Sequence, residues 1–125
     1  MTEATEATES PQAPIERAAY LRPLSITHAI NDVLGVDWRM LMGRKRHQSV
    51  SSARVMCGAM LRRRTSMSLE EIGTFLGNRD HSTVMYYVDK CDRDMSENPA
   101  VSATYRAVEK RAEEIESNVE HTPQA

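Results

Sequence analysis

The stretch from residue 68 to residue 84 constrains the fold of this chain more than any other part of its sequence. It opens with an S-x-x-E capping box at residues 68–71, which predicts the start of a short helix. Gly77 ends that helix, and Asp80 stands where it would cap a second, longer one. Two helices joined by a short turn that contains a glycine predict a helix-turn-helix unit.

The remaining sequence predicts more helices and no sheet. Ser25 is expected to cap a helix that stops at Gly35, and residues 36–42 form a shorter one. Serines at 49, 51 and 52 offer caps for a helix that ends in three arginines, residues 62–64. After Pro99, apolar residues step by three and four as far as Val119, which predicts an amphipathic helix folded onto its own domain. We therefore expect an all-α fold, a small helical bundle with a disordered N-terminal tail.

At 125 residues the chain has room for one domain. Residues 1–23 begin with an acidic Thr/Glu/Ala-rich segment and predict a disordered tail. Residues 24–118 are the expected helix-turn-helix domain, and residues 119–125 a flexible tail. Cys57 and Cys91 stand far apart without a CxxC pattern, so neither zinc nor a disulfide is indicated. We expect no metal, no cofactor and no membrane span, and a cytoplasmic location.

The net charge of −2 conceals a basic middle. Residues 39–64 hold eight bases and no acid, and residues 16–93 hold thirteen bases and eight acids, a net charge of +5. Such a segment favours a polyanionic partner.

The leading turn of the second helix carries the candidate base-reading residues. In helix-turn-helix proteins this turn enters the major groove of DNA. Here it holds Asp80, His81, Ser82 and Thr83, with Arg79 just ahead, all able to bond base edges or phosphates. The plainer alternative is that Asp80 only caps the helix and Thr83 returns a bond to it.

The segment 43–49 has no apolar residue and forms a candidate basic loop, with Arg44, Lys45 and Arg46. Basic arms can enter a narrow, A/T-rich minor groove, although such loops are often simply solvated. Arg54 and residues 62–64 could neutralise flanking phosphates.

Residues 68–84 read SLEEIGTFLGNRDHSTV and resemble the signature S-L-x-E-I-G-x-x-F-G-G-R-D-H-T-T-V of the C-terminal DNA-binding domain of the bacterial replication initiator DnaA. The upstream GRKRHQSVSSARVMCGAML is similar to that family's basic loop and following helix, and the likeness covers roughly residues 24–118. The resemblance implies a Trp-repressor-like bundle that binds a short, A/T-rich box. It implies that Arg46 enters the minor groove and that residues 79–83 read the major groove. It implies phosphate contacts at Arg54, Arg62, His81 and Thr83.

Several positions depart from the family pattern. Ser82 replaces a threonine, and Asn78 replaces a glycine, which is acceptable if the turn needs positive φ. Glu70 stands where the family often has a proline, and Tyr87 where it has a small residue. These differences predict a shifted box preference.

The leading hypothesis is sequence-specific binding of double-stranded DNA at DnaA-box-like sites, in replication initiation or its control. We expect a monomer on a single box, with replication proteins as further candidate partners and a phage or mobile element as one candidate source. No G-x-x-x-x-G-K-[ST] motif occurs, so we expect neither a bound nucleotide nor ATPase activity. The alternatives are a helix-turn-helix transcriptional regulator, or a protein-interaction module that uses the 101–119 stripe and the acidic termini. An enzyme has little support, because helix neighbours such as Asp80 and His81 do not face each other.

Overall fold

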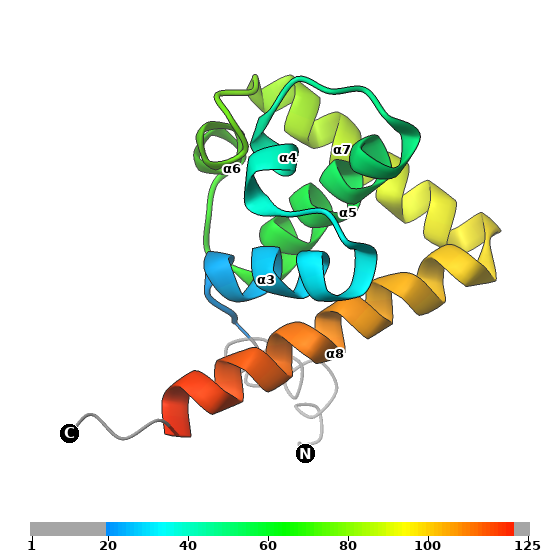
Figure 1. Cartoon of the computed structure of the whole chain (residues 1–125). Coiled ribbons are helices and arrows are strands. Elements are labelled where there is room, and N and C mark those ends of the chain that lie inside the picture. Colours follow the sequence, from blue (N-terminus) through cyan, green and yellow to red (C-terminus); the bar gives the residue numbers. More distant parts are fainter. Residues whose placement is uncertain (1–19, 122–125) are drawn as a thin grey trace, which may run out of the picture.

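A computed structural model describes residues 20–121 of the chain, without the side chains of residues 119–121, and over that range it contains helices and no strand. The helices are α3 (Pro23–Leu34), α4 (Trp38–Met42), α5 (Gln48–Arg64), α6 (Leu69–Phe75), α7 (His81–Glu97) and α8 (Pro99–His121). The predicted all-α bundle with a helix-turn-helix is thereby confirmed (Figure 1). The N-terminal tail lies outside the described residues up to residue 19, and the C-terminal tail from residue 122.

The folded part starts earlier and ends later than predicted. Leu21 is buried, and its amide donates to the Arg64 carbonyl at 2.7 Å. The first helix begins at Pro23, which suits a first helical turn because its missing N–H would have no partner there. At the other end, α8 continues to His121. The predicted boundaries at 24 and 118 each fall inside a helix.

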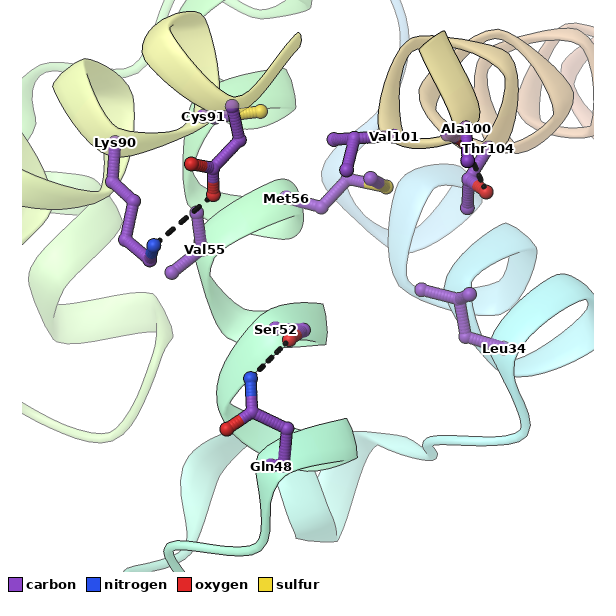
Figure 2. Close-up of a pocket in the computed structure, with 11 residues that line it drawn as sticks. Leu34, Gln48, Ser52, Val55, Met56, Lys90, Cys91, Ala100, Val101 and Thr104 are labelled. Carbon is purple, nitrogen blue, oxygen red and sulfur yellow. Dashed lines mark hydrogen bonds and ion pairs between the residues drawn. The ribbon is translucent and has the colours of Figure 1, made fainter. Parts of the chain in front are cut away.

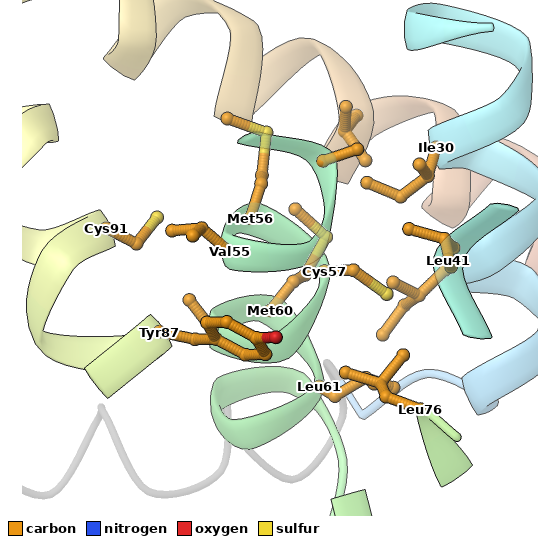
Figure 3. Close-up of a cluster of buried hydrophobic side chains, with 14 of the residues drawn as sticks. Ile30, Leu41, Val55, Met56, Cys57, Met60, Leu61, Leu76, Tyr87 and Cys91 are labelled. Carbon is orange, nitrogen blue, oxygen red and sulfur yellow. The ribbon is translucent and has the colours of Figure 1, made fainter. Parts of the chain in front are cut away.

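Helix α5 is the centre of the core. All residues from Ala53 to Leu61 are buried, whereas the sequence pattern predicted one buried face. Helices α3, α4, α6 and α7 pack against it. Figure 3 shows Met56, Met60 and Leu61 leaving α5 in different directions, toward different neighbours. Small residues such as Gly58 allow these helices to approach closely.

Two predicted caps are wrong. Ser25 is buried inside α3, and its hydroxyl donates to Glu116 Oε1 of α8 at 2.7 Å. The serines near residue 50 lie within α5, which begins at Gln48 after His47 and has no side-chain cap. In both cases the serines lie two or more residues beyond the N-cap, inside the helix, and the N-cap residue itself makes no side-chain bond to the first free amides.

The turn chemistry around the helix-turn-helix is confirmed. Ser68 and Glu71 form the reciprocal capping box, with bonds of 3.1 and 2.8 Å. Gly77 and Asn78 both have positive φ, 92° and 62°, so the asparagine adopts the left-handed conformation that glycine usually supplies. The helix caps and the turn conformation between α6 and α7 therefore follow from residues that are close in sequence.

Helix α8 folds back across the bundle, as predicted, and packs against α3 and α7 (Figure 1). Its apolar stripe is buried at Tyr105, Val108 and Ala112. The side chain of Val119 lies outside the described part. Because these stripe residues are covered by the domain itself, the interaction-module alternative loses one of its two proposed surfaces, the apolar stripe. Within residues 20–121, no helix combines the length and apolar character needed to cross a bilayer.

Candidate nucleic-acid interface

The basic loop joins α4 to α5 and is open to solvent. Arg44, Lys45 and Arg46 are all exposed, and none of them forms an ion pair within residues 20–121. Figure 1 shows this connection and the start of α7 at the same end of the molecule, the upper end in that view, away from α8. Unpaired cations on an exposed loop can approach an anionic ligand without first breaking a salt bridge.

The first turn of α7 presents a cluster of polar groups. Asp80 is the N-cap; its carboxylate accepts from the Ser82 amide at 3.2 Å and from the Ser82 hydroxyl. These two bonds hold the pKa of Asp80 below its usual range, so the group stays ionised. The side chains of Asp80 and His81 are 67% and 55% exposed, and Thr83 is half-buried. The Asp80 carboxylate therefore caps α7 and is at the same time exposed to solvent.

Arg79 has a structural role that sequence reasoning missed. Its Nη2 donates to the Gly43 carbonyl at 2.6 Å, and its Nη1 donates to the carbonyls of Leu76 and Met42. The side chain thus points to the connection after α4 and joins that connection to the turn before α7. The expectation that Arg79 is free to contact a base or phosphate is not supported by this placement.

Arg54 is not on the surface. It is 5% exposed, and its guanidinium donates to four backbone carbonyls at 2.8–2.9 Å. Burial is the main cause that lowers the pKa of Arg54, and the charge of Arg79 is the second. A guanidinium saturated by carbonyls cannot also neutralise a phosphate, so the expected phosphate contact is corrected to a role inside the fold.

The three arginines at the end of α5 differ in surroundings. Arg62 is exposed, and within residues 20–121 it makes only one weak bond, to the Met67 carbonyl at 3.5 Å. Arg63 pairs with Asp92 and lies 5.5 Å above the Tyr105 ring. Arg64 pairs with Glu109 and Glu113 of α8. Only Arg62 therefore remains available for a phosphate in this cluster.

Two exposed apolar residues extend the leading face of α7 and were missed by sequence reasoning. Met85 and Tyr86 are 48% and 53% exposed. They follow His81 and Ser82 by four residues, so each lies one turn further along the same face. The available signal was their position outside the buried stripe of Val84, Tyr87 and Cys91. Apolar groups at this place can contact thymine methyls.

A cavity of about 280 Å³ lies elsewhere, between α3, α5, α7 and α8 (Figure 2). Leu34, Val55 and Val101 line it, and a 3.1 Å ion pair between Lys90 and Asp94 stands at one side. None of the basic-loop residues or of residues 79–83 contributes to it. In the described part of the chain, no group of three or more His, Cys, Asp or Glu side chains could hold a metal ion.

The sequence of this chain is similar to those of known proteins. The family described as the bacterial dnaA protein helix-turn-helix matches residues 23–91. The chromosomal replication initiator protein DnaA of Gloeobacter violaceus is 31% identical over 97 residues, 78% of this chain and 21% of that protein. The DnaA of Roseiflexus castenholzii is 34% identical over 95 residues, 76% of this chain and 20% of that protein.

The chain therefore spans about a fifth of the length of these relatives. The family match covers more than half of this chain and contains α3 to α6, the basic loop and α7 as far as Cys91. The chain belongs to the family of the bacterial DnaA helix-turn-helix domain.

Proposed function

We propose that this chain binds double-stranded DNA sequence-specifically at DnaA-box-like sites, and that it acts in replication initiation or its control. One observation carries the proposal: the unpaired basic loop and the polar first turn of α7 lie at one end of the molecule and are joined through the Gly43 carbonyl. A single approach to a duplex then brings the loop to the minor groove and α7 to the adjacent major groove.

Each exposed residue has a distinct part in this arrangement. Arg46 enters the minor groove, flanked by Arg44 and Lys45. Asp80, His81 and Ser82 face base edges, where the ionised Asp80 accepts from the exocyclic amine of cytosine. The groups that bond the phosphate backbone are Arg62, His81 and Thr83.

We propose that this binding requires neither a bound nucleotide nor a bound metal ion. We also propose that one monomer binds each box. We further propose that the bound chain recruits replication proteins, competes with a full-length initiator for boxes, or represses initiation, in the cytoplasm. The relatives of this chain are chromosomal replication initiator proteins, which supports the link with initiation.

The test is selection of bound duplexes from a randomised pool, followed by anisotropy titration of the selected duplex and a scrambled one. Arg46→Ala and His81→Ala should each reduce the preference for the selected duplex, by about 1–3 kcal/mol for a good base contact. Arg62→Ala should weaken both duplexes equally and reduce the slope of log affinity against log salt by about 0.9.

Arg106→Gln on α8 is the matched control, because it removes one exposed positive charge on the helix farthest from the interface. It should leave the preference unchanged. A pool that yields no enriched sequence, or an Arg46→Ala variant that loses affinity equally for both duplexes, would contradict base reading. The first result would favour a module that retains the fold without sequence recognition.

A further inference from the structure

The connection after α4 is held by two arginines from other helices. Helix α4 is five residues long, and its last carbonyls lack partners within it. Arg54 of α5 donates to the carbonyls of Met40, Leu41, Gly43 and Lys45. Guanidinium groups suit this place because they carry several donors and a positive charge at a helix C-terminus.

Arg79 reaches the same connection from the helix-turn-helix. Its Nη2 donates to the Gly43 carbonyl, which also accepts from Arg54 Nη2 at 2.8 Å. Its Nη1 donates to Leu76, the residue that ends α6, and to Met42. We call Arg54, Arg79 and the shared Gly43 carbonyl the Gly43 clamp.

The backbone segments around the clamp are closely packed. A Cβ atom at Gly77 would lie 2.4 Å from the Met42 carbonyl oxygen and 2.9 Å from Arg79 Nη1. The turn before α7 therefore lies directly against the end of α4, and only a glycine fits there. The side chain of Arg79 is half-buried, and its guanidinium lies between these two backbones.

We propose that Arg79 and Arg54 are positioning residues, whose clamp holds the basic loop and the first turn of α7 as one rigid unit and so couples the minor-groove contact to the major-groove contact. This inference rests on the proposed function. A loop fixed before binding does not lose conformational freedom on the DNA, so the Arg46 contact contributes its full discrimination. A freed loop loses part of it.

The proposal gives Arg79 a different role from a phosphate contact, and lysine separates the two. Lysine keeps the charge and can still approach a phosphate, but it cannot place two donors in the planar fork that reaches three carbonyls. Arg79→Lys should therefore disrupt the clamp while leaving the salt dependence of DNA binding as in wild type. Arg62→Gln should do the reverse, lowering the salt slope and leaving the base preference intact.

The first measurement needs no DNA. Nitrogen-15 relaxation on the full chain gives the backbone order parameters of residues 44–46. They should be about 0.85 in wild type and fall below about 0.6 in Arg79→Lys. Arg106→Gln is the control, and thermal unfolding checks that each variant folds. Unchanged order parameters in a folded Arg79→Lys variant would overturn the clamp. Arg54→Lys should lower the same order parameters, and if that variant fails to fold, the half-buried Arg79 still carries the test.

The second measurement is a double-mutant cycle on the duplex selected from the randomised pool. Arg46→Ala should reduce the preference for that duplex over a scrambled one by about 5- to 150-fold in wild type, the range for one good base contact. The same change should have much less effect in the Arg79→Lys background, because the free loop no longer delivers Arg46. Val108→Ala, a core truncation in α8, controls for lowered stability and should leave the effect of Arg46→Ala at its wild-type size.

The outcomes separate the two proposals. A pool without an enriched sequence rejects the proposed function, while the relaxation data still decide whether the clamp orders the loop. An enriched sequence with strictly additive effects of Arg46→Ala and Arg79→Lys rejects the coupling and leaves the proposed function intact. Arg79→Lys with the loop order and the Arg46→Ala effect of wild type would instead fit a phosphate contact, which lysine retains, and would overturn the positioning role of Arg79.

Discussion

At the scale of single residues, Asp80 combines a structural and a proposed recognition role, and the two can be separated. Asparagine caps a helix about as well as aspartate, whereas alanine does not. Asp80→Asn should therefore keep the thermal stability of the wild type but change base preference, because its amide can also donate and carries no charge. Asp80→Ala should lower both stability and preference. Thermal unfolding and repeated duplex selection measure the two effects.

Asp80→Asn would contradict the recognition role if it selected the same sequence with the same preference as wild type.

The bonds from Ser82 that lower the pKa of Asp80 also make the stabilisation by this cap depend on pH. A depressed folded-state pKa gives stability that is present above the ordinary carboxylate pKa and is lost as pH falls through the folded value. The difference in melting temperature between Asp80→Ala and wild type should accordingly shrink in acid.

The roles that depend on neighbours in sequence were predictable, and those that depend on distant backbone were not. The Asp80 cap and the Ser68 box involve partners two and three residues away, so the pattern alone indicated them. Arg79 bonds the Gly43 carbonyl 36 residues away, and Arg54 the Leu41 carbonyl 13 residues away. Every residue has a backbone carbonyl, so the sequence does not show which carbonyl a distant arginine will bond. Both arginines were therefore predicted to be free to bind DNA.

At the scale of elements, the contact between α5 and α7 is specified by a glycine and a tyrosine. Tyr87 is bulky where the family pattern has a small residue, yet it is buried at 8% exposure. The explanation is Gly58, where a Cβ atom would lie 2.8 Å from Tyr87 Cδ2 and 3.2 Å from its Cβ. The departure at one position is thus accommodated by the absence of a side chain at the other, which sequence reasoning about α7 alone could not show.

This pairing predicts that Gly58→Ala destabilises the wild-type protein but stabilises a protein that lacks the Tyr87 ring. Gly58→Ala alone should destabilise the protein by about 1–3 kcal/mol, because the methyl overpacks against the ring. In a Tyr87→Ala background, which itself costs about 3–5 kcal/mol, the same change should stabilise by about 1 kcal/mol through helix propensity. Urea unfolding of the four proteins measures the coupling. Additive free energies of unfolding would show that the two residues do not limit each other.

At the scale of the whole molecule, α8 connects the bundle through buried and charged contacts. Val108 and Ala112 are fully buried, and Arg111 donates to Asp32 of α3 at 2.8 Å. The amphipathic spacing after Pro99 predicted the buried stripe, but not which helices it would cover. The bonds from Ser25 and Arg64 to α8 were also beyond prediction, because they join residues 91 and 45 positions apart. The carboxylates of Glu116 and Glu109 on α8 are therefore bonded to other helices of the same domain.

The enclosed core also predicts how global stability depends on pH. Burial raises the pKa of Cys57 to about 12, and it also raises the pKa values of Cys91 and Tyr105. A raised folded-state pKa gives stability that is complete below the unfolded value, near 9 for Cys57, and is lost as pH rises above it. Each such group contributes a slope of up to about 1.4 kcal/mol per pH unit.

Urea unfolding between neutral and alkaline pH should therefore show the free energy of unfolding falling above pH 9. Cys57→Ala should reduce that slope, because one buried thiol no longer ionises on unfolding. Val50→Ala is the matched control: it also truncates a buried side chain, so it should lower stability at every pH and leave the slope as in wild type. An identical alkaline slope in Cys57→Ala and wild type would show that the Cys57 thiol does not contribute to the pH dependence of folding.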